Sequence, residues 1–354
     1  MKIGLITIND NNNYGNRLQN FATQEFFHKK YNIDVYTIKN SILLNKNQKN
    51  LKYFIKFFVA NLKLVLEKFS LSKRQQAFNQ FNKKIKYNKN IINWYGNYKK
   101  ISNEYDMFLV GSDQVWNPYG RMSDIELLSF TEKSKISFAP SFGVSEIKEK
   151  DKEKLKKEIN KFKAISVREN EGKKIIQEVT DKNVEVLVDP TMLLESNDWD
   201  NVIRKPSQLK TDKYILNYFL GNLSEDKKQE IERIAKENNC EIINILDKNS
   251  PFYQTGPSEF LYLEKNAFLI CTDSFHSCVF AIIYNRPFVV FNREDKNVSM
   301  NSRIKTLLSK FKLENRYFKN SITNELLECD YTESHLILKE ERLKAVNFIN
   351  EALK

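Results

Sequence analysis

One pattern runs along most of the chain: short apolar runs bounded by polar residues alternate with segments of helical periodicity. Parallel strands must be joined by crossovers of a dozen or more residues, usually helices, so this alternation favours α/β layers with parallel sheets. The runs that predict strands are KIGLITI (2–8), IDVYTI (33–38), DMFLVGS (106–112), KISFAPS (135–141), AISVRE (164–169), VEVLVDP (184–190), KYILNYFL (213–220), EIINIL (241–246), AFLIC (267–271) and PFVVF (287–291).

The pattern breaks near residues 195–212, where the chain turns polar and carries Pro206, and then starts afresh. A chain of 354 residues fits two domains of ordinary size. We therefore expect two Rossmann-like lobes with a cleft between them, an N-terminal α/β lobe over 1–200 and a C-terminal α/β lobe over 207–354. The second lobe should end in a helix, because the last segment has Ser and Thr capping residues and a helical apolar period.

Residues 41–100 depart from this pattern, because they are basic, aromatic and helical in periodicity. Apolar positions recur at helical spacing with lysines between them: Tyr53, Phe54, Phe57, Phe58, Leu62 and Leu66. Such a helix can lie in a membrane interface, with its aromatic face near acyl chains and its lysines near lipid phosphates. The alternative is a helix that packs on the N-terminal lobe with its lysines in solvent. The sequence leaves both readings open.

The formal net charge of +12 indicates an anionic partner, such as phosphate, a phosphorylated ligand, an acidic membrane or nucleic acid. A general excess of Lys and Asn from codon bias is the competing explanation. Nucleic acid is not expected, because the basic residues are dispersed and no recognised DNA- or RNA-binding motif is present.

The four cysteines (Cys240, Cys271, Cys278 and Cys329) show no C-x-x-C spacing and do not cluster with histidine. We therefore expect no metal site and a reduced, cytoplasmic environment. The chain begins on a strand pattern without a secretory signal, and no apolar run approaches the roughly 18–20 residues of a membrane span. The expected location is cytoplasmic, with peripheral contact at the inner face of the membrane if 41–100 binds lipid.

The stretch CTDSFHSCVF (271–280) contains one of only three histidines in the chain. A predicted strand ends at Cys271, and Thr272, Asp273 or Ser274 can cap the helix that follows. His276 and Ser277 then fall in the first helical turn, where free N–H groups and the helix dipole favour an anion and tend to lower the pKa of an imidazole. We expect His276 to bind an anion or exchange a proton; the alternative is an ordinary buried histidine.

Other loops follow strand ends, where open parallel sheets bind their ligands. In NDNNNYGNRLQN (9–20), Gly15 permits a close backbone approach and Asn16 and Arg17 can reach a ligand, but the glycine spacing of a dinucleotide site is absent. In VGSDQVWNP (110–118), the polar side chains and Trp116 suit a sugar; the alternative is a tight loop with a buried tryptophan.

Three further strand ends carry weaker signals. ISVREN (165–170) offers Arg168 as an anion clamp, or as half of a structural pair with Glu169. FLGN (219–222) can present backbone N–H groups to an anion. VDPTMLL (188–194) is interpreted as mainly architectural, with Pro190 ending the strand.

Eight stretches in register resemble the polysaccharide pyruvyl transferase family. They are NNNYGNRLQNFA, DMFLVGSDQVWNP, SFAPSFG, AISVRE with the following EG, VDPTMLL, GPSEFLYLEKNA, TDSFHSCVFAIIYNRPF and MNSRIKTLL, from about residue 3 to about 310. The resemblance implies a two-lobed fold similar to GT-B glycosyltransferases. It also implies transfer of pyruvate from phosphoenolpyruvate to two sugar hydroxyls as a ketal, without a metal or other cofactor.

The resemblance links His276 and Arg168 with donor binding or catalysis. The N-terminal lobe is then the expected acceptor side and the C-terminal lobe the expected phosphoenolpyruvate side. The remaining candidates for the donor or its anionic groups are Ser274, Ser277, Gly221, Asn222 and Arg303. The candidates for a carbohydrate acceptor, free or lipid-linked, are Asn16, Arg17, Ser112, Asp113, Gln114 and Trp116. A glycosyltransferase that uses a nucleotide sugar is the alternative enzyme, because the same architecture serves that chemistry.

Overall fold

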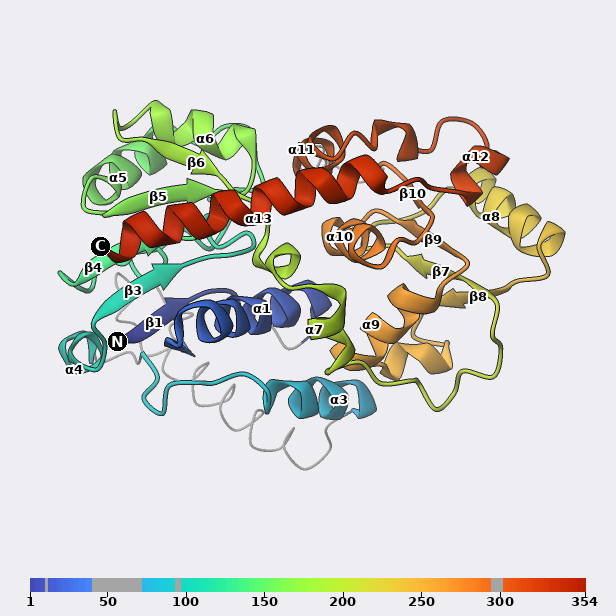
Figure 1. Cartoon of the computed structure of the whole chain (residues 1–354), viewed down its shortest axis with the longest axis horizontal. Helices are drawn as coiled ribbons and strands as arrows, with labels where there is room; N and C mark the ends of the chain where they lie inside the picture. Colours follow the sequence, from blue (N-terminus) through green and yellow to red (C-terminus); the bar gives the residue numbers. More distant parts are fainter. Residues whose placement is uncertain (10–11, 40–71, 93–96, 294–301) are drawn as a thin grey trace, which may run out of the picture.

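A computed structural model of the chain describes residues 1–9, 12–39, 72–92, 97–293 and 302–354. Within these residues the chain forms two parallel sheets, one of six strands and one of four, with helices packed on both (Figure 1). The sheets lie side by side along the long axis of the molecule, and the last helix, α13, runs across from one to the other.

The first sheet has the strand order β2-β1-β3-β4-β5-β6, and every pairing in it is parallel. Its strands are β1 (Lys2–Ile6), β2 (Asp34–Thr37), β3 (Met107–Val110), β4 (Ser134–Ser137), β5 (Ala164–Val167) and β6 (Val184–Val186). Its helices are α1 (Tyr14–Tyr31), α3 (Lys73–Asn82), α4 (Tyr98–Asn103), α5 (Glu149–Ile159) and α6 (Asn170–Gln177). The short 3-10 helix η1 (Pro190–Leu193) and α7 (Ser196–Asp200) lead to the second sheet.

The second sheet has the order β10-β9-β7-β8, again with parallel pairings. Its strands are β7 (Tyr214–Tyr218), β8 (Glu241–Asn244), β9 (Leu269–Thr272) and β10 (Phe288–Val290). The helices of this half are α8 (Glu225–Glu237), α9 (Pro257–Asn266), α10 (Phe275–Tyr284), α11 (Ser302–Lys310), α12 (Asn324–Leu327) and α13 (Thr332–Leu353), with 3-10 helices η2 (Pro251–Gln254) and η4 (Glu314–Arg316).

Alternating side chains of each strand enter different hydrophobic cores, as the two-residue period of a strand requires. In β3, Met107 and Leu109 join one core while Phe108 and Val110 join another. The first of these cores continues into the second half of the molecule, where it contains Leu216 of β7. The two lobes therefore share one continuous apolar core rather than meeting at a bare hinge.

Trp199 of α7 lies at the centre of this shared core and is fully buried. Its ring centroid is 5.7 Å from that of Phe21 in α1 and 5.1 Å from that of Phe280 in α10. The Trp199 indole N–H donates a hydrogen bond to the carbonyl oxygen of Thr191 in η1 (3.2 Å). One side chain thus joins α1 of the first lobe to α10 of the second.

The terminal helix α13 returns from the second lobe to the first (Figure 1). Arg342 donates to the carbonyl oxygens of Met192 (2.8 Å) and Leu194 (2.7 Å), and Lys344 donates to that of Val186 (3.1 Å). These contacts fasten α13 to the end of β6 and to η1. The expected division of the chain into lobes at 1–200 and 207–354 stays a prediction. It placed the terminal helix in the second lobe and did not include its return to the first lobe.

All ten predicted strands are present in the structure. β4 and β6 end four residues before their predicted ends, and every other strand end lies within two residues of its predicted position. The aromatic stripe from Tyr53 to Leu66 lies outside the described residues. In the part of 41–100 that is described, Phe78 and Phe81 of α3 are buried in the shared core. Lipid contact by this segment therefore stays a prediction.

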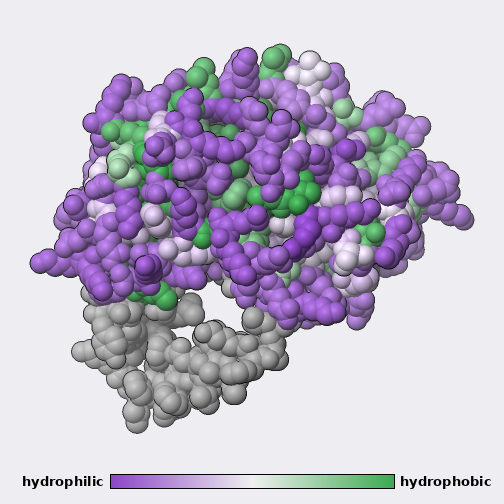
Figure 2. All heavy atoms as spheres, turned by 60° about the horizontal axis from the view of Figure 1, so that its bottom comes forward, coloured by the Kyte–Doolittle hydropathy of each residue, from purple (hydrophilic) through white to green (hydrophobic). Residues whose placement is uncertain are grey.

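Figure 2 shows one face of the molecule, on which hydrophilic residues predominate and apolar areas are small and separated. The large apolar side chains exposed among the described residues are Met1, Ile91, Tyr119, Leu220, Leu336 and Leu343. Within those same residues, no helix is both long and apolar enough to cross a bilayer.

Candidate active site

The two sheets have equivalent switch points, where consecutive connections leave the sheet in opposite directions. In the first sheet this point lies between β1 and β3, and in the second between β7 and β9. Ligands of open α/β sheets bind outside the carboxyl ends of strands at such points. The loops from all four strands line a single hollow of about 130 Å³. It is lined by Ile8, Asn13, Asn16, Asp113, Gln114, Arg121, Tyr218, Leu220, Ser274, Phe275, His276, Arg293 and Arg303.

His276 lies in the first turn of α10, where the sequence predicted it, and only 7% of it is exposed. Gly15 of α1 packs against its ring, since a Cβ added at Gly15 would lie 2.1 Å from Nδ1, 2.5 Å from Cε1 and 2.6 Å from Cγ. No L-amino acid other than glycine fits there without moving the imidazole. The close approach predicted for Gly15 is therefore an approach to this histidine.

Asp189 lies between β6 and η1, and it faces the other side of the histidine. Its Oδ2 lies 3.8 Å from Nε2 of His276, and that nitrogen is buried without a hydrogen-bond partner among the described residues. Burial is the largest influence on the pKa of His276 and lowers it; the Asp189 and Asp113 carboxylates oppose the shift without reversing it. The free site therefore holds a neutral imidazole near pH 7.

Arg168 is not a free anion clamp in this structure. Its guanidinium is buried between Asp189 (2.7 Å) and Asp113 (3.3 Å) and lies over the ring of Phe275 at 4.3 Å. Burial tends to lower the pKa of Arg168, but the surrounding carboxylates outweigh it and raise it. Arg168 does not line the hollow. The alternative prediction was a structural pair with Glu169, and the Nε of Arg168 lies 4.0 Å from the Glu169 carboxylate.

Asp113 joins the network to the hollow. Its backbone φ of 62° lies in the left-handed region, which Asp tolerates better than most residues. It accepts hydrogen bonds from the side chain of Asn16 and from the N–H of Gln114 (2.8 Å). Burial raises its pKa, but Arg168, His276 and Arg303 together lower it to about 2. A carboxylate that stays ionised therefore faces the hollow from the first lobe.

Three arginines line the hollow from different elements. Arg303 stands at the start of α11, and its Nη1 lies 3.9 Å from Asp113; burial lowers its pKa to about 10. Arg293 follows β10 and contacts Asp273 at 3.0 Å. Arg121 comes from the loop after β3. Since the N-termini of α1 and α10 also meet here, the hollow favours a small anion.

Of the residues predicted from the sequence, six line the hollow: Asn16, Asp113, Gln114, Ser274, His276 and Arg303. Three others point into the protein interior. Arg17 donates to the carbonyl oxygen of Ile8 (2.8 Å), Ser277 to Glu264 (2.6 Å) and Trp116 to the carbonyl oxygen of Glu126 (2.9 Å). Trp116 is fully buried, which agrees with the alternative prediction of a tight loop with a buried tryptophan.

The remaining predicted residues support the site or lie beside it. Ser112 is buried and its hydroxyl contacts both the carbonyl oxygen of Ala139 (2.7 Å) and Oδ2 of Asp189 (2.8 Å). The N–H of Gly221 donates to Asp273 (2.8 Å), so an internal carboxylate already fills the backbone cradle predicted for an anion. Asn222 is exposed and does not line the hollow.

Sequence reasoning missed Arg121, Arg293 and Asp189. The interpretation of VDPTMLL as mainly architectural was incomplete, because Asp189 both starts η1 and contacts the histidine. A carboxylate near the end of the predicted strand run 184–190 was the available signal. Arg121 and Arg293 lie several residues beyond their strands, where one sequence offers no comparable sign.

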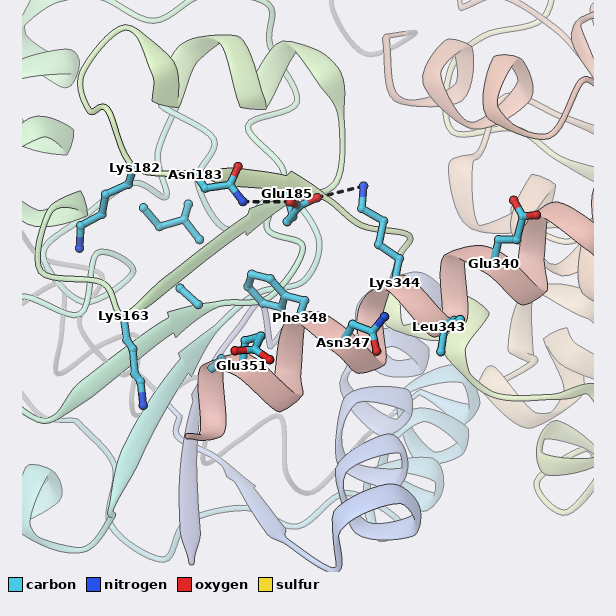
Figure 3. A pocket seen from close by; sticks show the side chains of 13 residues that line it. Lys163, Lys182, Asn183, Glu185, Glu340, Leu343, Lys344, Asn347, Phe348 and Glu351 are labelled. Atoms are coloured by element: carbon cyan, nitrogen blue, oxygen red, sulfur yellow. Dashed lines mark hydrogen bonds and ion pairs between the residues drawn. The ribbon is translucent and has the colours of Figure 1, made fainter.

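A larger hollow lies elsewhere, between α13 and the starts of β5 and β6 (Figure 3). It measures about 790 Å³ and combines apolar side chains such as Leu343 and Phe348 with lysines and glutamates. The ion pair from Lys344 to Glu185 (3.1 Å) crosses its edge. Its charges are of both signs and it holds no histidine, so it lacks the anion-binding character of the smaller hollow. Within the described part of the chain, no three His, Cys, Asp or Glu side chains are placed to hold a metal ion.

Comparison with solved structures identifies the class of fold. A glycosyltransferase from Rickettsia africae ESF-5 aligns over 100% of this chain and 98% of its own, with a TM-score of 0.50 and 11% identity. A UDP-GlcNAc 2-epimerase from Neisseria meningitidis, bound to UDP-GlcNAc, aligns over 99% and 94%, with a TM-score of 0.47 and 11% identity. The first of these two likenesses shows the fold alone: the protein is a two-lobed α/β protein of the GT-B type, and it has a basic hollow at its switch points.

The family follows from the sequence itself. A family model described as polysaccharide pyruvyl transferase matches residues 13–295, which is most of the chain. The chain therefore belongs to the polysaccharide pyruvyl transferase family, as the eight motifs indicated. Comparison with curated proteins gave no significant match.

Proposed function

We propose that this family member transfers pyruvate from phosphoenolpyruvate to two hydroxyls of one sugar in a cell-surface polysaccharide, or in its lipid-linked precursor, as a ketal. The observation that carries the proposal is the convergence of His276 with Arg121, Arg293 and Arg303 around one small hollow. A histidine beside several arginines suits a substrate that has two anionic groups and must accept a proton.

The reaction balances with these groups. C3 of the enol phosphate takes a proton from the imidazolium form of His276, which makes C2 an oxocarbenium-like electrophile. Two sugar hydroxyls then attack C2 in turn, the bond from C2 to the phosphate oxygen breaks, and inorganic phosphate leaves. One proton is gained at C3 and two are released from the hydroxyls, of which one returns to the imidazole and one leaves with phosphate or solvent.

The charges of the hollow suit the two ends of the donor. Arg303 and Arg293 are proposed to bind the carboxylate and the phosphate, where donors aimed at developing charge also stabilise departure of the phosphate. Asn16, Gln114 and the Asp113 carboxylate are proposed to meet the acceptor hydroxyls. Arg168 is proposed to act from outside the hollow, by holding the carboxylates that face the histidine.

The size of the hollow favours phosphoenolpyruvate over the alternative donor, a nucleotide sugar. About 130 Å³ corresponds to roughly four waters at about 30 Å³ each, whereas sites for larger ligands usually measure about 300–1,000 Å³. No metal or organic cofactor is proposed. A cytoplasmic location, with membrane contact through 41–100, is proposed with the same function, because phosphoenolpyruvate and lipid-linked sugars meet at the inner face of a membrane.

Thermal stabilisation by each donor tests the proposal before any acceptor is known. Phosphoenolpyruvate at about 100 times its Kd should stabilise the fold by about 2.7 kcal/mol, while UDP-GlcNAc should leave the Tm unchanged. Arg303→Met should abolish the shift, and Arg233→Met, which alters an exposed arginine on α8, should retain it. Stabilisation by UDP-GlcNAc alone would contradict the proposal and favour a glycosyltransferase.

A further inference from the structure

We propose that Asp189 is the positioning residue of His276: it holds the proton on Nε2 and leaves Nδ1 as the nitrogen that exchanges a proton with the substrate. The inference rests on the acid/base role proposed for His276 above. It concerns a residue whose side chain does not line the hollow and which therefore acts only through the histidine.

The first step is the position of the carboxylate. Oδ2 of Asp189 is 3.8 Å from Nε2, and no other hydrogen-bond partner for that nitrogen exists in the described part of the chain. Hydrogen bonds of catalytic groups are often long in the free protein and tighten when substrate binds, and a shift of about 1 Å brings this pair to hydrogen-bond distance. A carboxylate only accepts hydrogen bonds, so it selects the tautomer with hydrogen on Nε2.

The second step is the fixed state of the carboxylate itself. Oδ1 of Asp189 accepts hydrogen bonds from the N–H (3.0 Å) and the hydroxyl (2.8 Å) of Thr191. Oδ2 accepts from Ser112 (2.8 Å) and from Arg168 (2.7 Å). Burial raises the pKa of Asp189, but His276, Arg168 and Thr191 outweigh it, so the pKa is lowered. The carboxylate is therefore ionised and cannot turn away from the ring.

The third step is the fixed plane of the imidazole. Gly15 covers the ring near Nδ1, and Phe275 meets it edge-on with centroids 5.3 Å apart. The ring cannot rotate freely between these neighbours, so the nitrogen that faces Asp189 is set by packing. Nδ1 is then the remaining nitrogen of a residue that lines the hollow. In the imidazolium form it donates a proton, and in the neutral form it accepts one.

The charges around the ring make Asp189 decisive for its protonation. The groups that face His276 are the carboxylates of Asp189 and Asp113 and the guanidiniums of Arg168 and Arg303; Arg121 and Arg293 line the same hollow. Burial, helped by Arg168 and Arg303, disfavours the imidazolium, and the two carboxylates oppose that effect. Removal of the Asp189 charge would leave only Asp113 to stabilise the protonated form that the reaction requires.

Nitrogen-15 NMR of the histidine side chains tests the inference without turnover, and the chain has only three histidines to assign. In the wild-type protein with inorganic phosphate as the probe, neutral His276 should be the Nε2–H tautomer. Asp189→Asn should lower the pKa of His276 by about one unit or more and mix the tautomers. Thr191→Val is the matched control. It removes one hydrogen-bond donor to Oδ1 of Asp189 but keeps the carboxylate charge, so it should change neither the pKa nor the tautomer of His276.

Turnover separates this inference from the proposed function. Asp189→Asn should lower kcat with phosphoenolpyruvate at least tenfold, shift its pH profile to lower pH and leave KM within a few-fold. An Nδ1–H tautomer in the wild-type protein would overturn the inference even if the enzyme is a pyruvyl transferase, and needs no variant that must fold. An unchanged His276 pKa in folded Asp189→Asn would overturn it as well. Predicted NMR changes without turnover by the wild-type protein would support the pairing and refute the proposed reaction instead.

Discussion

At the scale of single residues, the site depends on glycine and carboxylate neighbours of one imidazole. Gly15 and Asp189 lie on opposite sides of His276 and come from opposite ends of the first lobe's sequence. Each residue is unfavourable at its position when considered by itself. The glycine stands in a helix, where it lowers stability, and the carboxylate is buried, where it needs several hydrogen-bond donors. Both are accounted for by the histidine between them.

Substitution of Gly15 by alanine should separate stability from activity. Alanine is the better helix former by about 1 kcal/mol, but its Cβ must displace the imidazole. A displacement of about 1 Å should reduce turnover about 100-fold, since catalysis depends on the position of the reacting group. Gly172→Ala in α6 is the milder control, because its Cβ would lie 3.3 Å from Phe142, which needs to move by only a few tenths of an ångström. Full activity of Gly15→Ala would show that contact with Gly15 does not fix the position of the His276 ring.

The buried His276 should also leave a signature in stability against pH. Its folded pKa is lowered, so below about pH 6.5 the unfolded chain takes up a proton at this imidazole that the folded chain does not. The free energy of unfolding should therefore fall as the pH drops from about 6.5 towards the folded pKa. His276→Gln should lose less stability than the wild type between pH 7.5 and 5.5 in urea unfolding. An equal loss in both proteins would show that the histidine is not buried as described.

At the scale of elements, the strands could be predicted because each is a short apolar run that ends in polar or turn-forming residues. DMFLVGS and AFLIC are clear examples, and both became central parallel strands. The loop after β9 was predicted to hold the site because its polar residues directly follow the carboxyl end of that apolar run. The order of strands could not be predicted, because it depends on contacts between segments far apart in sequence. Asp189 and Arg293 escaped prediction for this reason too, since only the folded sheets bring Asp189 to His276 and Arg293 to the same hollow.

The contact between α13 and η1 predicts a stability effect far from the hollow. Arg342→Ala removes the donors to the carbonyl oxygens of Met192 and Leu194 and should cost about 1–3 kcal/mol. Because η1 directly follows Asp189, the loss should also lower activity. Lys339→Ala, an exposed position of the same helix, should change neither. Chemical denaturation measures the first effect, and a wild-type unfolding free energy in Arg342→Ala would contradict it.

At the scale of the whole molecule, the continuous core predicts that the two lobes unfold together. Loss of Trp199, which packs on both Phe21 and Phe280, should cost about 3–5 kcal/mol as Trp199→Ala. The wild-type protein should show one transition, with coincident melting curves by far- and near-ultraviolet circular dichroism. Two separate transitions would mean that the shared core does not couple the lobes.

The most direct test of the proposed reaction is the release of inorganic phosphate from phosphoenolpyruvate in the presence of sugar acceptors. A panel of lipid-linked and nucleotide-linked sugars should contain an acceptor that makes the release depend on both substrates, with one pyruvate ketal formed per phosphate. His276→Ala should abolish that release while its circular dichroism stays that of the wild type. Release that persists in His276→Ala, or turnover of a nucleotide sugar with no use of phosphoenolpyruvate, would contradict the account.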